Sequence, residues 1–143
     1  MTETDPISKS EYEALARFRH VLRQFLHFSE QSARSVGLTP QQHQALLAIR
    51  GFSGRDEITV GELAECLLIQ HHSAVGLVDR LENQSLVHRG HHDGDKRQVY
   101  IGLTPQGKSV LEALSAVHRT ELGQLEPQLA ELLSQIVPKN EEL

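Results

Sequence analysis

Residues 58–107 decide the fold, and they read ITVGELAECLLIQHHSAVGLVDRLENQSLVHRGHHDGDKRQVYIGLTPQG. Thr59 and Glu62 have the spacing of a capping box, which predicts a short helix at residues 60–67. A second helix is expected at residues 71–84, because apolar residues recur there with the spacing of one helix face. These residues are Ala74, Leu77, Val78 and Leu81. Two short helices joined by about three residues have the pattern of a helix-turn-helix.

The end of the same stretch predicts a β-hairpin and a further helix. Asp93-Gly94 is a strong signal for a hairpin turn. Beyond the turn, apolar residues alternate with the period of a half-buried strand. These residues are Val99, Ile101 and Leu103. Thr104-Pro105 then starts the next helix. A helix-turn-helix followed by such a hairpin is a winged helix-turn-helix, and the hairpin is its wing.

Helices are also expected on both sides of this region. Apolar residues at helical spacing predict a helix at residues 9–35, and Thr39-Pro40 predicts another that runs to Arg50. After Pro105 a run of leucines continues at three- and four-residue spacing, and Pro127 should kink this run or begin a sixth helix. The expected fold is mainly α with a small antiparallel β wing.

The charge of the chain is distributed unevenly. The 143 residues carry a formal net charge of −5, but residues 71–108 hold five Lys or Arg against four Asp or Glu, with five of the nine histidines. Residues 109–143 hold two basic and six acidic residues. For nucleic-acid binding the local charge matters more than the sum. The acidic total therefore does not exclude DNA as a partner.

Several other classes of protein lack support in the sequence. Cys66 is the only cysteine, which suits a reducing compartment, and no run approaches the roughly 20 apolar residues of a membrane helix. The polar N-terminus has no apolar signal core. We therefore expect a cytoplasmic protein without a membrane partner. No P-loop, nucleophile elbow, paired-cysteine or HExxH motif is present, so we expect no enzyme and no cofactor.

The helix-turn-helix offers a candidate DNA-reading surface. In such motifs the second helix enters the major groove, and its N-terminal residues contact base edges. The residues at this position are Gln70, His71, His72 and Ser73. Glutamine can pair with adenine, and histidine or serine can bond to several base edges. Arg80 lies further along the helix and is better placed for the phosphate backbone than for bases.

The wing offers a second candidate contact with DNA. Lys96 and Arg97 follow the hairpin turn, where they can reach phosphate or an adjacent minor groove. The narrow minor groove of A·T-rich DNA has an enhanced negative potential that attracts arginine. Asp95 lies two residues before Arg97, on the same side of an extended strand, and can hold the guanidinium in a fixed direction.

Several of these stretches resemble the MarR family of bacterial transcription regulators. LVDRLE at 77–82, followed by Leu86-Val87, resembles the end of that family's recognition helix, and GLTP at 37–40 resembles the start of its second helix. Asp95-x-Arg97, five residues and then LTPxG at 103–107 match its wing pattern. The resemblance covers about residues 12–120 of the printed sequence. It implies a sequence-specific DNA-binding regulator, more often a repressor, that binds a pseudo-palindromic operator as a homodimer.

The resemblance also implies roles for single residues. Arg97 would enter the minor groove, with Asp95 as its orienting partner. Gly76 lies where the family often has a longer polar or basic side chain, so one contact is expected to be missing. Gln70 stands where a Ser, Asp or Asn cap is usual, which weakens the start of its helix.

The terminal helices are implied to form a dimerisation region. Residues 1–36 and 105–143 would supply it, around a DNA-binding domain at residues 37–104, in one compact unit. The interface residues would be Leu15, Phe18, Leu22, Leu122, Leu125, Leu129, Leu132 and Ile136. The alternative is that these apolar stripes form the core of a single chain.

The signal that such a regulator senses stays open. Regulators of this family often respond to a small aromatic or phenolic effector, or to oxidation of a cysteine. Cys66 lies beside an apolar stripe, where a lone cysteine is usually a small core residue. A zinc-responsive regulator would need a long-range set of ligands from His20, His43 or His118. The rival class is a winged helix that binds another protein, which the acidic net charge motivates.

Overall fold

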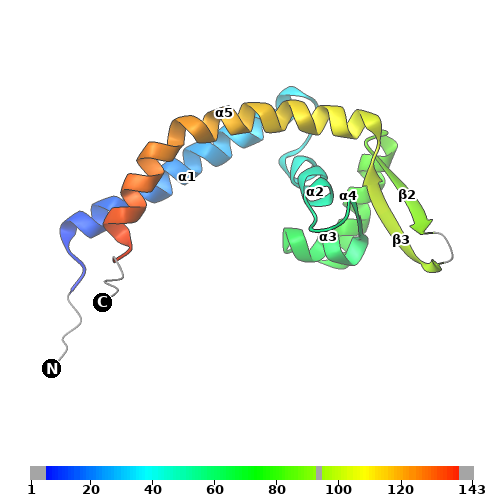
Figure 1. Cartoon of the computed structure of the whole chain (residues 1–143), viewed down its shortest axis with the longest axis horizontal. Helices are drawn as coiled ribbons and strands as arrows, with labels where there is room; N and C mark the ends of the chain where they lie inside the picture. The colour runs from blue at the N-terminus through cyan, green and yellow to red at the C-terminus, as the bar shows by residue number, and fades with distance from the viewer. Residues whose placement is uncertain (1–5, 93–94, 139–143) are drawn as a thin grey trace. The chain divides into compact units, whose positions relative to one another are not determined.

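The computed structural model describes residues 6–92 and 95–138, and of Asp95 and Lys96 it describes the backbone only. The chain is mainly helical with one small antiparallel sheet, as predicted (Figure 1). The predicted turn at Asp93-Gly94 lies outside the described residues. In chain order the elements are α1 (Lys9–Ser35), α2 (Pro40–Arg50), β1 (Glu57–Thr59), α3 (Val60–Leu67), α4 (His71–Asn83), β2 (Val87–His92), β3 (Asp95–Leu103) and α5 (Pro105–Ile136).

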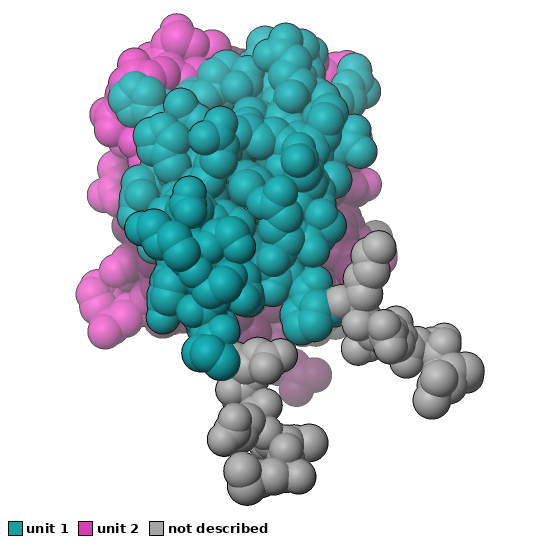
Figure 2. All heavy atoms as spheres, turned by 90° about the vertical axis from the view of Figure 1, so that its left-hand side faces the viewer, with its two compact units in different colours: residues 1–29, 117–143 teal, residues 30–116 magenta. Residues whose placement is uncertain are grey.

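The chain divides into two compact units (Figure 2). Unit 1 contains residues 1–29 and 117–143, and unit 2 contains residues 30–116. Helices α1 and α5 therefore contribute to both. Each unit has its own cluster of buried apolar side chains.

Capping boxes start the helices where the sequence predicts them. In α2 the Thr39 hydroxyl accepts from the Gln42 N–H at 3.1 Å, and the Gln42 side chain accepts from the Thr39 N–H at 3.0 Å. Thr59 and Glu62 form the same pair of bonds at the start of α3. Each box satisfies two backbone donors that a helix start would otherwise leave without an intrahelical partner. The helix predicted at 71–84 ends one residue earlier, at Asn83.

The sheet has a strand that the sequence did not predict. β1 pairs with β3, opposite Ile101, and β3 pairs with β2 on its other edge, so the strand order is β1-β3-β2. β1 has three residues, of which only Ile58 is buried, and three residues are too few for a period to be read. Ile101 and Leu103 are buried as predicted, but Val99 is exposed.

The core of unit 2 is built around α4. Its buried stripe meets apolar side chains of α2, α3, the sheet and the first turns of α5. The fully enclosed members are Ala33, Ala45, Leu46, Ile49, Ile58, Leu63, Leu77, Val78, Leu81 and Ile101. Burial of one such side chain stabilises a fold by about 1.5–3 kcal/mol. The orientation of α4 about its own axis is therefore strongly determined.

In unit 1, α1 and the C-terminal half of α5 run antiparallel side by side (Figure 1). Their buried contacts are Ala14, Val21 and Leu132, with Phe18, Leu125, Leu129 and Ile136 packed against them. The prediction of a sixth helix at Pro127 is wrong, because α5 continues through this residue to Ile136. Apolar contacts from Leu125 and Leu129 lie on both sides of the proline, and they offset the loss of one backbone hydrogen bond.

The close packing at the junction between β3 and α5 leaves no room for a methyl group at Gly107. A Cβ atom at Gly107 would overlap the backbone carbonyl of Leu86, which accepts a hydrogen bond from the Thr104 N–H at 3.1 Å. We expect Gly107→Ala to lower the free energy of unfolding by about 1–3 kcal/mol, since backbone must shift to admit it. Urea denaturation at fixed protein concentration measures the change.

Gly123→Ala is the matched control for Gly107→Ala. It lies in α5 with open space around its Cβ position, so we expect a gain of about 0.5–1 kcal/mol. Equal effects of the two substitutions would show that the contact with Leu86 does not limit position 107.

Candidate nucleic-acid interface

The buried stripe of α4 fixes which residues of this helix face outward. Because Leu77, Val78 and Leu81 are enclosed, the opposite side of the helix is left at the surface. The sequence-predicted residues Gln70, His71, His72, Ser73 and Arg80 are all exposed. Gly76 lies among them and is half-buried. The structure thus brings these six positions onto or beside one helix.

The start of α4 has no side-chain cap, as predicted. Gln70 occupies the N-cap position with an extended backbone, at φ −75° and ψ 154°, and its side chain makes no capping hydrogen bond. The first backbone N–H groups of a helix have no partner within the helix, and they carry a partial positive charge. The exposed N-terminus of α4 can therefore accept a phosphate group as well as present side chains to bases.

The turn between α3 and α4 is made by residues 68–70. Leu68 has a left-handed backbone conformation, with φ 57° and ψ 43°, and its side chain is exposed. The Leu68 and Ile69 N–H groups donate to the carbonyls of Glu65 and Ala64 at 3.2 and 3.0 Å. These bonds end α3 and redirect the chain within three residues. Glycine is the usual residue in this conformation, and none is present here. The turn could therefore be predicted only from the gap between the two predicted helices.

The wing consists of β2 and β3. Arg97 is exposed on β3, close to the turn that joins the two strands. The side chains of Asp95 and Lys96 lie outside the described residues, so their predicted roles stay predictions. The ladder between β2 and β3 is irregular between Gly90 and His92. Such irregularities increase the local twist of a hairpin.

An ion-pair cluster that the sequence reasoning missed joins the wing to α4. The two guanidinium nitrogens of Arg89 on β2 contact Asp79 and Glu82 of α4, each at 2.5 Å. The hydrogen bond to Asp79, assisted by Glu82, raises the pKa of Arg89. Asp79 and Glu82 are three residues apart and so project from one side of the helix, which was the available signal. Arg89 also offsets one of the two negative charges beside the candidate DNA surface.

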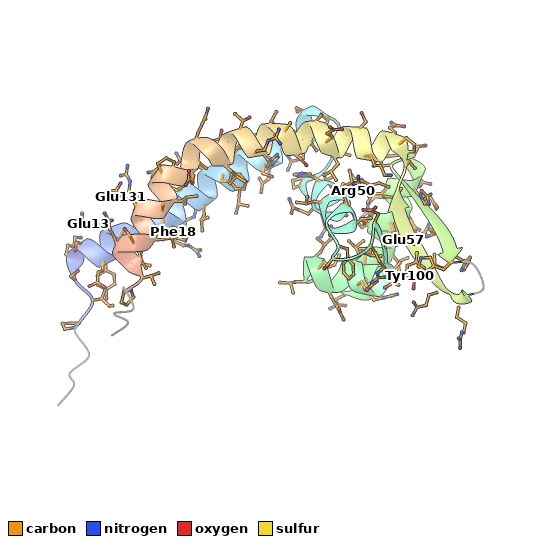
Figure 3. The ribbon with its side chains drawn as sticks, viewed as in Figure 1. Glu13, Phe18, Arg50, Glu57, Tyr100 and Glu131 are labelled. Atoms are coloured by element: carbon orange, nitrogen blue, oxygen red, sulfur yellow. The ribbon has the colours of Figure 1, made fainter. Side chains whose placement is uncertain are left out.

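A second network ties the wing to β1 and α3. The His92 ring stacks on the Tyr100 ring, with the ring centres 3.7 Å apart, and hydrogen-bonds to Glu57 on β1. Glu57 and Tyr100 are labelled in Figure 3. Arg55 lies 5.7 Å from the centre of the Tyr100 ring and forms an ion pair with Glu62. The sequence reasoning missed this network because it depends on β1. It connects the wing to the cap of the helix-turn-helix.

The surroundings of the capping carboxylate of Glu62 lower its pKa. Partial burial raises the pKa of Glu62, but hydrogen bonds from the Thr59 backbone and the Arg55 guanidinium outweigh burial and leave the pKa below its ordinary value. The hydrogen bond to Glu62 in turn raises the pKa of Arg55. The ionised carboxylate is therefore the form that the folded state favours.

The residues proposed for sensing are placed differently from expectation. Cys66 is exposed, so the expectation that it is a small core residue is wrong. The buried residues of α3 are Leu63 and Ala64, and Cys66 points to another side of the helix. In unit 1, His118 Nε2 lies 2.8 Å from the Ser29 hydroxyl, between the edges of Phe25 and Phe28. Among the described residues, no three His, Cys, Asp or Glu side chains are grouped closely enough to hold a metal ion.

The predicted interface residues divide into two groups. Phe18, Leu125, Leu129, Leu132 and Ile136 pack within unit 1 itself. Leu15, Leu22 and Leu122 are exposed by 40%, 37% and 45%. Within residues 6–92 and 95–138, no helix has the length and apolar composition needed to cross a membrane.

Helices α2, α3 and α4, with the sheet β1-β3-β2, define a winged helix-turn-helix protein. The model of the MarR family matches residues 36–98. Transcriptional regulator HosA of Escherichia coli O127:H6 is 31% identical in an alignment of 128 residues, and the match covers 84% of this chain and 91% of HosA. The chain belongs to the MarR family, as its resemblance to that family implied.

Two further proteins are similar to this chain. The HTH-type transcriptional repressor NicR of Pseudomonas putida is 26% identical over 113 residues, covering 76% of this chain and 70% of NicR. A mutant of MepR from Staphylococcus aureus, solved bound to an oligodeoxyribonucleotide, is similar with a TM-score of 0.68. That likeness covers 85% of this chain and 96% of the MepR chain at 22% identity, so it speaks for the fold alone.

The pKa of Glu62 predicts a pH dependence of stability. Because this pKa is lowered on folding, its stabilising effect is present near neutral pH and is lost as the pH falls through the folded value. We expect Glu62→Gln to be less stable than the wild type at about pH 7, and its stability to decline less steeply below about pH 4.5. Urea denaturation at a series of pH values measures both.

Glu65→Gln removes an exposed carboxyl from the same helix and is the control for Glu62→Gln. If wild type and Glu62→Gln lost stability in parallel as the pH falls, the ionised cap would not stabilise α3.

Proposed function

We propose that this member of the MarR family binds a pseudo-palindromic DNA operator as a homodimer and acts as a ligand-responsive repressor. The chain is a DNA-binding transcriptional regulator. One observation carries the proposal further: the N-terminal turn of α4 is exposed and uncapped, while the rest of the helix is anchored in the core of unit 2. A helix so held can enter a major groove without distortion of the domain.

The proposed contacts with DNA follow from the chemistry of each residue. Gln70, His71, His72 and Ser73 would meet base edges and phosphate at the start of α4. Arg97 would enter the minor groove beside it, with Asp95 as its orienting partner and Lys96 on phosphate. The pairing of Arg89 with Asp79 and Glu82 supports this arrangement, because it holds the wing against the same helix.

A second copy of the chain is the proposed partner of unit 1. Exposed apolar residues lie on both of its helices, beside those that form its own cluster. The exposed set is Tyr12, Leu15, Leu22, Leu26, Val117, Leu122 and Leu133. Large exposed apolar patches on soluble proteins mark interaction sites. The division into dimerisation helices at 1–36 and 105–143 and a DNA-binding domain at 37–104 is part of this proposal.

The regulatory signal is proposed to be a small aromatic or phenolic molecule, and the chain is proposed to be cytoplasmic and not an enzyme. The name of NicR as a repressor supports the sign of regulation. The redox alternative rests on Cys66 alone, and the zinc alternative has no group of three ligands among the described residues in its favour.

The rival function is a winged helix that binds another protein. Salt dependence separates the two, because a protein that contacts several phosphates loses orders of magnitude in DNA affinity between about 50 and 200 mM salt. Affinity for a selected operator that stayed constant over this range would favour the protein-interaction module.

Removal of the wing arginine tests the DNA contact. We expect Arg97→Ala to weaken operator binding by about 1–3 kcal/mol, because a guanidinium in a minor groove replaces released counterions and contacts base edges. Fluorescence anisotropy with a labelled operator at fixed salt measures the loss. Arg119→Ala removes an exposed arginine of unit 1 and serves as the control. If Arg97→Ala bound as tightly as the wild type, the wing assignment would fall.

A charge placed on the exposed apolar face of unit 1 tests the homodimer. We expect Leu22→Glu to shift the chain to monomer in sedimentation velocity and to lower operator affinity, because burying an unpaired carboxylate between two copies is costly. Leu47→Glu is the matched control, since Leu47 is an exposed leucine of unit 2. A Leu22→Glu protein that remained dimeric would remove this face from the interface.

A further inference from the structure

The side chain of Arg80 extends along α4 toward the start of the helix. A Cβ atom at Gly76 would lie 3.7 Å from Nη1 of Arg80. The guanidinium therefore rests over the space that a side chain at position 76 would occupy. Residues 76 and 80 are about one turn apart on the same face, so the charged group is carried about 6 Å toward the N-terminal end of α4.

That end of the helix is the one proposed to meet base edges. His72, Gly76 and Arg80 are spaced by four residues and form a row on the side of α4 that faces away from the core. The guanidinium over Gly76 is thus the next group in the row after His72. A longer side chain at position 76 would have filled this place.

Among the described residues, no carboxylate engages the donors of Arg80. Arg80 forms no ion pair with any residue that the structure describes, and its nearest acidic neighbours in sequence, Asp79 and Glu82, both hold Arg89. An arginine in this situation presents five N–H donors in a planar fork. Guanine offers the matching pair of acceptors, O6 and N7, in the major groove.

We propose that Arg80 reads a guanine base in the major groove, and that Gly76 permits this by leaving room for the guanidinium. The inference rests on the proposed DNA-binding function and deepens it. It revises the expectation from the sequence that Arg80 contacts the phosphate backbone. The base contact that a longer side chain at position 76 would make is then replaced by the contact of Arg80.

Selection of binding sites from randomised duplexes tests the role of Gly76. We expect the wild type to enrich one guanine in each half-site of a symmetric operator. Gly76→Ala should keep this preference, because a Cβ atom at 3.7 Å is an ordinary contact. Gly76→Leu should lose the preference, because its larger side chain displaces the guanidinium.

Base substitution in the selected operator tests the contact itself. We expect Arg80→Ala to bind the guanine operator roughly 5- to 150-fold more weakly than the wild type does. An operator with 7-deazaguanine at this position lacks the N7 acceptor. It should weaken binding by the wild type and leave binding by Arg80→Ala unchanged. The exposed position of Arg80 and the high helix propensity of alanine make a folded variant the expected product.

Two results would overturn the inference while leaving the regulator intact. One is a loss in Arg80→Ala that is equal across all sequences, with a salt slope lower by about one, which is the signature of a phosphate contact. The other is a wild-type operator whose enriched guanines are insensitive to both Arg80→Ala and Gly76→Leu. If the wild type enriched no sequence at all, the proposed function itself would fail.

Discussion

The burial of one side of α4 is the constraint on which the rest of the structure depends. Leu77, Val78 and Leu81 are enclosed by α2, α3 and the sheet, so α4 can neither rotate nor slide without exposing apolar surface. Every polar group on the other side is thereby given a fixed position. The first turn of α4 has no side-chain cap, and His71, His72 and Ser73 are exposed there. The candidate DNA-binding residues of α4 therefore lie outside the part of the helix that packs in the core.

Ion pairs with α4 help to hold the wing in position. Arg89 connects β2 to two carboxylates of α4, and the ring of Tyr100 connects β3 to His92 and Arg55. A two-stranded hairpin on its own is marginally stable in water, so its contacts with α4 and β1 decide its direction. The pairing of Arg89 also limits the repulsion that Asp79 and Glu82 would exert on a phosphate backbone. A chain with a net charge of −5 can in this way present a surface suited to DNA.

Local signals in the sequence predicted the helices well, but they could not predict contacts between residues far apart in the chain. The capping boxes at Thr39 and Thr59 placed two helix starts correctly, because a cap depends on residues only three apart. The contact of Arg89 with α4 depends on the angle at which β2 leaves the helix, which no spacing encodes. At Pro127 a local signal misled, because proline usually interrupts a helix but the packing of Leu125 and Leu129 keeps α5 continuous. The direction of the Arg80 side chain also required coordinates.

Hydrogen–deuterium exchange of the full chain, with and without its selected operator, tests most directly that α4 and the wing together bind the duplex. The Ser73 and Ala74 amides donate to the Gln70 carbonyl, but the His71 and His72 amides precede these bonds and should exchange quickly in the free protein. We predict that the operator slows exchange in this turn and in β3 around Arg97, and leaves the buried amides of α2 unchanged. Protection confined to unit 1, with none at the start of α4, would contradict the proposed binding surface.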